Sequence, residues 1–145
     1  MKLKLHIGLV AFLFLFLGAL QAQEIRQATL SNIQGEVLVR QGTGDWKPAT
    51  DGMKLSIQDE VKTAQGSTAQ VVLDNGEVTI KERSLFKIDA MDVDPQSGDK
   101  TTYLDLALGR IMVHAQKLEG NSKFEVRTPT STTGVRGTMF EVSAE

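Results

Sequence analysis

The chain of 145 residues contains no cysteine, three prolines, one tryptophan and one tyrosine. Because no disulfide can form, the fold has to be stabilised by burial of apolar side chains alone. The charges form no basic stripe or patch, which excludes the electrostatic footprint of a nucleic-acid-binding protein. No long segment repeats its apolar residues at the 3.6-residue spacing of an amphipathic helix, so a helical domain is not indicated.

Groups that could carry out catalysis are also scarce. Beyond the N-terminal segment His114 is the one histidine, and a lone histidine makes neither a catalytic triad nor a metal site. Asp92–Asp99 superficially resembles a calcium loop, but Ser97 replaces the required glycine and Tyr103 replaces the required glutamate, which favours a solvated turn. Gly134–Thr138 lacks the lysine of a phosphate loop. We therefore expect no enzyme activity, no metal and no cofactor.

The N-terminus has the pattern of an export signal. Lys2 and Lys4 precede the uncharged apolar run Ile7–Leu20, and a polar stretch follows. This pattern predicts a signal peptide over residues 1–22, a mature domain over residues 23–145, and a periplasmic or secreted location. The alternative is an uncleaved membrane anchor, although the run would span roughly 21 Å of a bilayer core of about 30 Å. Contact with a membrane is expected only in that case.

The mature sequence alternates apolar and polar residues with a period of two. Ile33–Val39 and Ala69–Leu73 both do so, and turn formers separate such runs at short intervals. Asn75-Gly76 is the sharpest hairpin signal, because both residues accept the positive φ of a two-residue turn. Tyr103–Val113 is apolar at both parities. It predicts one long strand or two strands bent at Gly109, although its periodicity alone is also compatible with a helix. The fold class is therefore all-β.

A weak repeat runs through these strands. Gly35, Gly76 and Gly109 each begin a Gly-x-aliphatic-x-aliphatic segment. The spacing is irregular, which argues against a strict repeat array. The glycines could mark points where chains pass closely, or glycine before a strand could simply be common.

The C-terminal stretch contains Phe-Glu-Val twice, at Phe124–Val126 and Phe140–Val142. We expect these segments to be paired strands that frame a loop. Pro129 should end the first strand because proline cannot donate to a sheet ladder. The threonine and serine hydroxyls of the loop can bond nearby backbone groups, and its glycines permit unusual backbone geometry. The candidate interaction residues of this loop are Thr128, Pro129, Gly134, Val135, Arg136, Gly137 and Thr138.

Two roles are open for Arg136. Its guanidinium could have a structural role, by satisfying loop carbonyls or by pairing with Glu125 or Glu141 and so locking the framing strands. Alternatively, it could face a protein partner or an anionic envelope polymer. Trp46 has a similar ambiguity. It could be an exposed platform for a glycan, or it could cap the core.

The stretch Phe124–Val142 resembles the closing motif of the FecR family of bacterial envelope domains. In that motif Phe-x-Val-x-Thr-Pro and Val-Arg-Gly-Thr precede a final Phe-x-Val strand. The resemblance covers about residues 28–143 and departs from the family at Gln58, where glycine often precedes the aspartate of a Gly-Asp turn. Shorter upstream matches occur in the family's order: Gly35-Glu-Val37, Trp46, Gly52-x-x-Leu55, Asp59-x-Val61-x-Thr63, Ser67-Thr-Ala69, Asp74-Asn-Gly76 and Leu106-x-x-Gly109-Arg-Ile111.

The resemblance implies a twisted, periplasmic all-β domain with a solenoid-like or sandwich-like arrangement of short strands and hairpins. It also implies a role in signal perception or protein–protein interaction, with an envelope protein as partner. The residues ahead of Ile7 are too few to hold a sigma factor, as the best-known members do, so we expect a stand-alone sensing or scaffold module. Two alternatives stay open: a module that binds glycan or peptidoglycan, and a membrane-anchored fragment of a sigma-factor regulator.

Overall fold

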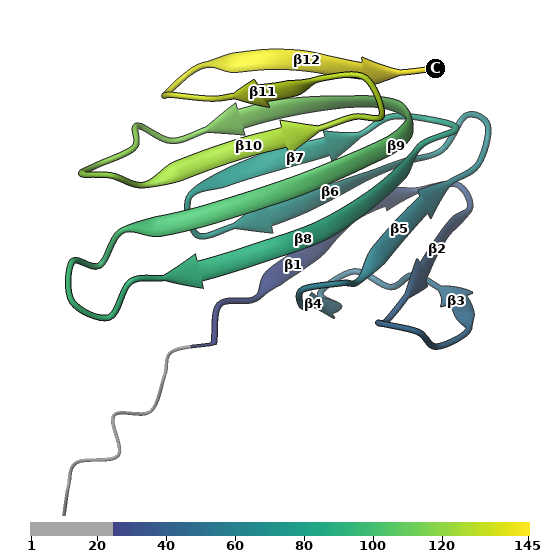
Figure 1. Cartoon of the computed structure of the whole chain (residues 1–145). Coiled ribbons are helices and arrows are strands. Elements are labelled where there is room, and N and C mark those ends of the chain that lie inside the picture. Colours follow the sequence, from purple (N-terminus) through teal and green to yellow (C-terminus); the bar gives the residue numbers. More distant parts are fainter. Residues whose placement is uncertain (1–24) are drawn as a thin grey trace, which may run out of the picture.

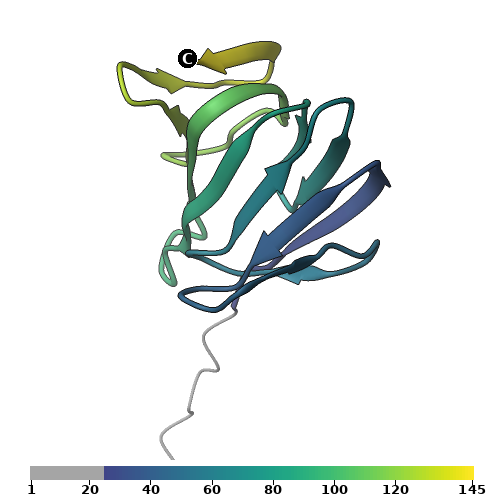
Figure 2. The ribbon, with the colours of Figure 1, turned by 90° about the vertical axis from the view of Figure 1, so that its right-hand side faces the viewer.

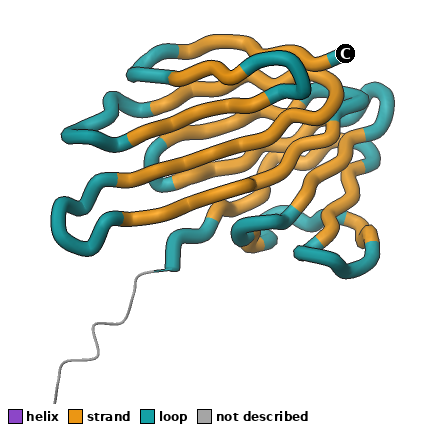
Figure 3. Tube along the Cα trace, viewed as in Figure 1, coloured by secondary structure: helices purple, strands orange, loops and turns teal. Residues whose placement is uncertain are grey.

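The structure is a computed structural model that describes residues 25–145. The predicted signal peptide over residues 1–22 lies outside this range. In the described range the fold consists of strands and connecting loops (Figure 3). No helix long and apolar enough to cross a membrane occurs within residues 25–145.

The all-β prediction is therefore confirmed. The strands are β1 (Ala28–Gln34), β2 (Val37–Arg40), β3 (Trp46–Pro48), β4 (Lys54–Leu55), β5 (Glu60–Thr63), β6 (Thr68–Leu73), β7 (Gly76–Ile80), β8 (Leu85–Val93), β9 (Lys100–Ala115), β10 (Lys123–Arg127), β11 (Thr132–Gly134) and β12 (Met139–Ala144).

The strands form one sheet that curls like half a barrel. Its main order is β3-β2-β5-β8-β9-β7-β6-β1-β4, with β10 and β12 both added to β9 and β11 added to β10. Curling brings the half with β1, β6, β7 and β12 opposite the half with β2, β5, β8 and β10 (Figures 1 and 2). All pairs are antiparallel except β9 with β10. The arrangement is closer to a sandwich than to a solenoid.

The alternation seen in the sequence places one face of each strand in a single core. Fully buried side chains come from both halves of the sheet: Leu30, Val71, Val78 and Ile111 from one, and Val61, Phe86, Ile88, Leu104, Leu106 and Val126 from the other. Each fully buried aliphatic or aromatic side chain contributes about 1.5–3 kcal/mol of burial free energy. Burial alone can therefore close the fold, as the absence of cysteine requires.

Two glycines let the chain cross between the halves of the sheet. Gly35 (φ 77°) lies between β1 and β2, and Gly109 (φ 96°) bends β9. At each corner the next backbone N–H donates to a serine hydroxyl, that of Ser67 at 2.9 Å and that of Ser84 at 3.0 Å. A Cβ on Gly109 would lie 2.5 Å from Cα of Ser84, so no side chain fits there. Two of the three glycines of the weak repeat, Gly35 and Gly109, thus mark equivalent corners.

The long apolar segment is a single strand bent in the middle. The first part of β9, up to Leu108, pairs with β8, and the part from Ile111 onward pairs with β7. The same strand therefore belongs to both halves of the sheet, which explains its apolar residues at both parities. The choice between strand and helix is settled in favour of strand.

The β6–β7 hairpin exists, but its turn differs from the prediction. Leu73 pairs with Gly76, so the turn residues are Asp74 and Asn75, and neither Asn75 nor Gly76 has a positive φ. Gly76 is required for another reason, because a Cβ there would lie 3.1 Å from Cε2 of Phe124. Asn75 is buried, and its amide donates to Oγ1 of Thr102 at 3.0 Å.

The turn at Gln58-Asp59 keeps its geometry despite the missing glycine. Gln58 itself has φ 69°, a left-handed conformation that glycine adopts at lower cost. The buried carboxylate of Asp59 accepts hydrogen bonds from the N–H of Gly42 at 3.0 Å and the N–H of Ser56 at 2.8 Å. The aspartate therefore organises the turn, and the side chain before it is tolerated.

The start of the described chain is held by a buried arginine. Arg26 is 8% exposed, and its guanidinium donates to the carboxylate of Asp74, to Oγ1 of Thr102 and to the carbonyls of Asp92 and Thr101. All five N–H groups of the fork therefore have an acceptor. This cluster ties residues before β1 to the β6–β7 turn and to β9.

Candidate interaction surface

The turn Thr128–Ser131 joins β10 to β11 and contains the predicted Thr-Pro pair. The N–H of Thr128 donates to the carbonyl of Ser131 at 2.8 Å, and Oγ1 of Thr128 accepts from the N–H of Ser131 at 3.1 Å. Pro129 takes the second position of the turn, where its fixed φ is favourable. The hydroxyls of Thr128 and Ser131 hold this turn. Pro129 ends β10 at Arg127, as predicted.

The two Phe-Glu-Val strands do not pair with each other, so that prediction is wrong. β10 runs parallel to residues 101–105 of β9, whereas β12 runs antiparallel to residues 109–114 of β9. Between them, β11 pairs with β10 and the chain then crosses to the other half of the sheet. The sequence repeat arises because both strands cover the same core from different halves.

Val135 anchors the crossing. It is 4% exposed, and its N–H donates to the carbonyl of Phe124 at 2.9 Å. Its isopropyl group is part of the core cluster. Val135 therefore has a structural role within the candidate loop.

The remaining loop glycines are used unequally. Gly137 has φ 61°, so a side chain there would be strained by the backbone conformation, while its Cβ position lies at an ordinary contact distance of 3.4 Å from Cα of Lys117. Gly134 ends β11 without a positive φ and has open space where a Cβ would stand. Thr138 leads into β12, and its carbonyl accepts from the N–H of Ala115 at 3.3 Å.

Arg136 is exposed between these anchored neighbours. Within residues 25–145 it forms no ion pair, and Glu141 instead lies near Arg110, with 3.4 Å between Nε and Oε1. The predicted lock through Glu125 or Glu141 is therefore wrong. The physical reason is that β10 and β12 lie in different halves of the sheet, so Arg136 does not bridge them.

A depression of about 440 Å³ lies beside Arg136. That volume is within the range of small-molecule and peptide-side-chain pockets. Its lining residues come from the ends of β10 and β11 and from the preceding loop: Leu118, Ser122, Lys123, Phe124, Glu125, Gly134, Val135 and Arg136. Two cations and one carboxylate are thus arranged around apolar side chains.

A second charged cluster lies on the outer face next to the Thr-Pro turn. Arg127 hydrogen-bonds Asp89, and its Nε lies 3.0 Å from Oδ1 of Asp105 in an ion pair whose angle is too poor for a hydrogen bond. The guanidinium also stacks 5.3 Å from the ring centroid of Tyr103. Nζ of Lys87 lies 3.5 Å from Asp89 and 3.4 Å from Asp105.

These contacts shift the titration of the pair. Burial raises the pKa of Asp89, but the hydrogen bond and charge of Arg127 outweigh it, so the pKa lies below its usual value. The hydrogen bond to Asp89 raises the pKa of Arg127 despite some burial. Both groups are thus held in their charged forms. The guanidinium of Arg127 is already engaged by partners within the domain.

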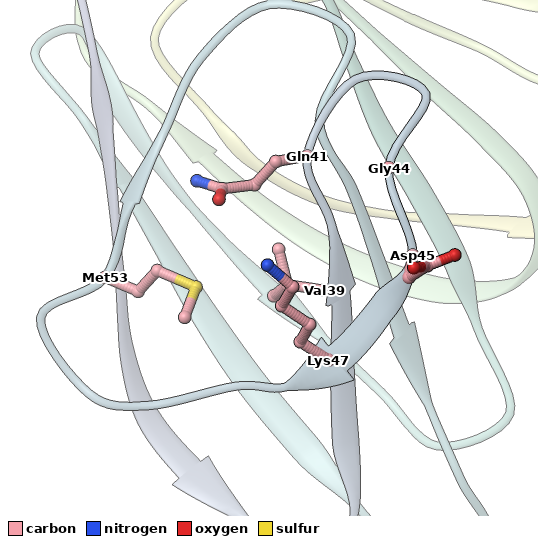
Figure 4. Close-up of a pocket in the computed structure, with 6 residues that line it drawn as sticks. All are labelled: Val39, Gln41, Gly44, Asp45, Lys47 and Met53. Carbon is pink, nitrogen blue, oxygen red and sulfur yellow. The ribbon is translucent and has the colours of Figure 1, made fainter.

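Trp46 lies at an edge of the sheet and is half-buried in β3. The guanidinium of Arg40 stacks over its ring at 4.8 Å from the centroid, and the tryptophan is not a member of the core cluster. Neither predicted role fits fully, because one ring face is already covered. A nearby cavity holds about 50 Å³, space for a water molecule but not for a sugar ring. Figure 4 shows its lining residues Val39, Gln41, Gly44, Asp45, Lys47 and Met53.

Two other predictions from the sequence concern solvated groups. His114 is exposed on the outer face, opposite to its buried neighbours Val113 and Ala115. In the turn Asp92–Asp99, the carboxylate of Asp94 accepts hydrogen bonds from the N–H of Gln96 at 2.8 Å and the N–H of Ser97 at 3.1 Å. These backbone hydrogen bonds lower the pKa of Asp94. Both placements agree with the sequence.

Sequence reasoning missed the two arginines that hold the fold. Arg26 and Arg127 carry little local signal, because their partners lie 22 to 76 residues away along the chain. Their positions, two residues before β1 and at the end of β10, are the only local indication that they lie against the sheet. The arginines that stabilise the fold are therefore Arg26 and Arg127, and not Arg136 of the C-terminal loop.

Comparison with known proteins gives one match. A family model described as FecR protein matches residues 59–145, more than half of the chain. No curated protein and no solved structure matches the chain. The matched range begins at the buried aspartate of the Gln58-Asp59 turn and includes the candidate loop.

Proposed function

This chain belongs to the FecR protein family, and from that premise we propose that it is an exported, non-enzymatic domain of a bacterial cell envelope that perceives a signal by binding another protein. Family membership supports a role in signal transduction. The export pattern of the first 22 residues supports an envelope location. The exposed loop around Arg136 is the surface through which we propose that the partner binds.

The observation that supports this proposal is a difference in burial and contacts among the residues that match the family motifs. Asp59, Thr63 and Ser67 are all buried and hydrogen-bonded to the backbone, so each has a sufficient role in folding. Arg136 is exposed, and its side chain has no comparable contact among residues 25–145. An arginine held outward between a buried Val135 and a left-handed Gly137 has the form of a recognition group.

The experiment compares Arg136→Ala with Lys62→Ala, a matched loss of an exposed cation on β5. Each exported protein is used to capture partners from envelope extract, and each is bound in parallel to purified cell-wall polymer. We expect Arg136→Ala to weaken binding of the captured protein about 10- to 100-fold, as for an interface arginine, while Lys62→Ala binds normally. The melting temperatures of both variants should stay within about 2 °C of the parent, because surface changes cost little.

The results separate the proposal from its alternatives. Equal binding by both variants, or a large fall in melting temperature for Arg136→Ala alone, would refute the recognition role. Binding to cell-wall polymer that Trp46→Ala abolishes would favour the glycan-binding module instead. An intact mass that begins at Met1 would identify an uncleaved anchor and favour the anchored regulator fragment.

A further inference from the structure

The four edges of the curled sheet are protected unequally. β3 (Trp46–Pro48) is short and contains a lysine and a proline, β4 (Lys54–Leu55) has two residues, and β11 (Thr132–Gly134) has three. Short edge strands, lysine and proline all discourage pairing with another chain. β12 (Met139–Ala144) has six residues, an unbroken register and none of these features. Among the strands of residues 25–145 it pairs with β9 alone, and Figure 1 shows it at the rim of the sheet.

The backbone groups that β12 presents at this edge can be identified. Thr138 and Ala115 are a hydrogen-bonded pair, because the N–H of Ala115 donates to the carbonyl of Thr138. Hydrogen-bonded and non-hydrogen-bonded pairs alternate along an antiparallel ladder. Even-numbered residues of β12 therefore bond β9, and the N–H and C=O groups of Met139, Glu141 and Ser143 point to the open edge.

The side chains next to this edge are also incompletely covered. Phe140 packs against the core but stays partly exposed, while Val142 (7%) and Ala144 (9%) complete the inward face. An open depression of about 970 Å³ adjoins the C-terminal end of β12, but it lies on the outer face and is lined largely by charged side chains. An added strand with apolar residues on its inward face would cover the exposed part of Phe140.

We propose that this edge pairs antiparallel with β12 of a second copy of the chain, in the register that places Glu141 opposite Ser143. β12 has the required alternation, with Phe140, Val142 and Ala144 facing inward. The inward-facing residues of one copy must lie opposite inward-facing residues of the other. Because only odd-numbered residues have free backbone groups, odd-numbered residues must also lie opposite each other. Few two-fold symmetric registers meet both conditions.

Strand overlap excludes the registers centred on Phe140 or Ala144, which would pair at most three residues of β12, and charge selects among the others. Centring the two-fold axis on Glu141 would set two carboxylates opposite each other, and centring it on Ser143 would oppose Glu141 with Glu145, which also repels. Centring it on Val142 opposes Glu141 with Ser143 and brings the two Val142 side chains together. That register is self-complementary, as a two-fold interface has to be.

The dimer is expected to be weak, because one six-residue strand buries less than the roughly 800 Å² per partner of a standard interface. We expect a dissociation constant of roughly 10 µM to 1 mM. This inference goes beyond the proposed function and does not depend on Arg136, which lies outside β12.

The absence of cysteine makes the register directly testable. Glu141→Cys and Ser143→Cys variants of the exported protein are oxidised separately and as a mixture. Opposite residues lie about 5.5 Å apart between Cα atoms, within disulfide reach, whereas equal residues would be offset by two positions and lie beyond about 7 Å. The mixture should therefore form cross-linked dimer several-fold faster than either variant alone. Equal rates in all three samples would overturn the register.

Sedimentation then tests the role of the edge itself. Ser143→Pro removes an outward N–H without breaking the β9 ladder, whereas Ser143→Ala keeps that N–H and serves as its control. Ser143→Ala should dimerise with rising concentration like the parent, and Ser143→Pro should stay monomeric. A parent that stays monomeric up to about 1 mM, or one in which dimer survives Ser143→Pro in a folded variant, would overturn the proposal. If Ser143→Pro fails to fold, cross-linking of the mixed Glu141→Cys and Ser143→Cys variants still tests whether β12 pairs in the proposed register.

Discussion

Replacing Arg26 with alanine should destabilise the domain far more than its position before β1 suggests. The side chain is 4% exposed and uses all five N–H groups, on Asp74, Thr102 and two carbonyls. Hydrogen bonds to charged groups contribute about 1.5–3 kcal/mol each, and removing one partner of a buried ion pair costs about 3–5 kcal/mol. Asp74 is 39% exposed and keeps Lys100 at 2.9 Å, which reduces the loss. We expect about 2–4 kcal/mol.

For a domain of this size that loss corresponds to a fall in melting temperature of roughly 8–16 °C. Thermal unfolding followed by circular dichroism measures it. Arg26→Lys should fall between the parent and Arg26→Ala, since an ammonium can keep the ion pair but cannot reach all the acceptors of the fork. Arg40→Ala is the matched control. Arg40 is 37% exposed and pairs with Glu60, so its loss should cost about 1 kcal/mol or less.

The same pair predicts a dependence on pH. Burial raises the pKa of Asp74, but the hydrogen bonds from Arg26 and Lys100 outweigh it, and the pKa lies below its usual value. A carboxyl with a lowered folded-state pKa stabilises the protein above its unfolded pKa of about 3.9, and this stability is lost as the pH falls through the folded value. The difference between parent and Arg26→Ala should therefore be constant from about pH 5 to 8 and shrink below about pH 4. A loss under about 1 kcal/mol at pH 7, or a difference that does not change in acid, would refute the reasoning.

Two further substitutions test the backbone. Gln58→Gly should raise the melting temperature by roughly 2–4 °C, because glycine relieves a left-handed residue whose exposed side chain makes only long contacts to Asp89; a lower melting temperature would contradict this. Gly109→Ala should cost about 3–5 kcal/mol, since its Cβ would overlap the backbone of Ser84 as well as strain φ. Gly52→Ala, with φ 84° and open space, should lose only the strain of about 1–2 kcal/mol in chemical denaturation, and equal losses would rule out the close approach.

Much of the local structure could be predicted because it depends on neighbours in the sequence. The alternation of Phe124 and Val126 with polar residues gave the buried face of β10 correctly, and Pro129 marked the end of that strand. The hairpin at Asp74–Gly76 was recognised from its turn formers, but its turn residues were misplaced by one. The reason for Gly76 is the ring of Phe124, which no local pattern reveals.

The candidate site was predicted less well than the fold. The candidate loop divides into a turn at Thr128–Ser131, a buried Val135 and an exposed Arg136. The sequence left two roles open for Arg136 and assigned none to Arg26 or Arg127. Which arginine is buried depends on the partners that folding supplies, and those of Arg26 come from strands up to 76 residues away.

The sequence by itself determined an all-β fold with one apolar face per strand, because the alternation of side chains is a property of each strand alone. The tertiary structure decided that β10 and β12 would both pair with β9, that Gly109 would bend this strand between the halves of the sheet, and that β12 would form the open edge. Strand pairing depends on which distant segments bury their side chains in the same core. It also depends on which residues are small enough for another strand to pass close by. Identical Phe-Glu-Val segments can therefore reach different halves of the sheet.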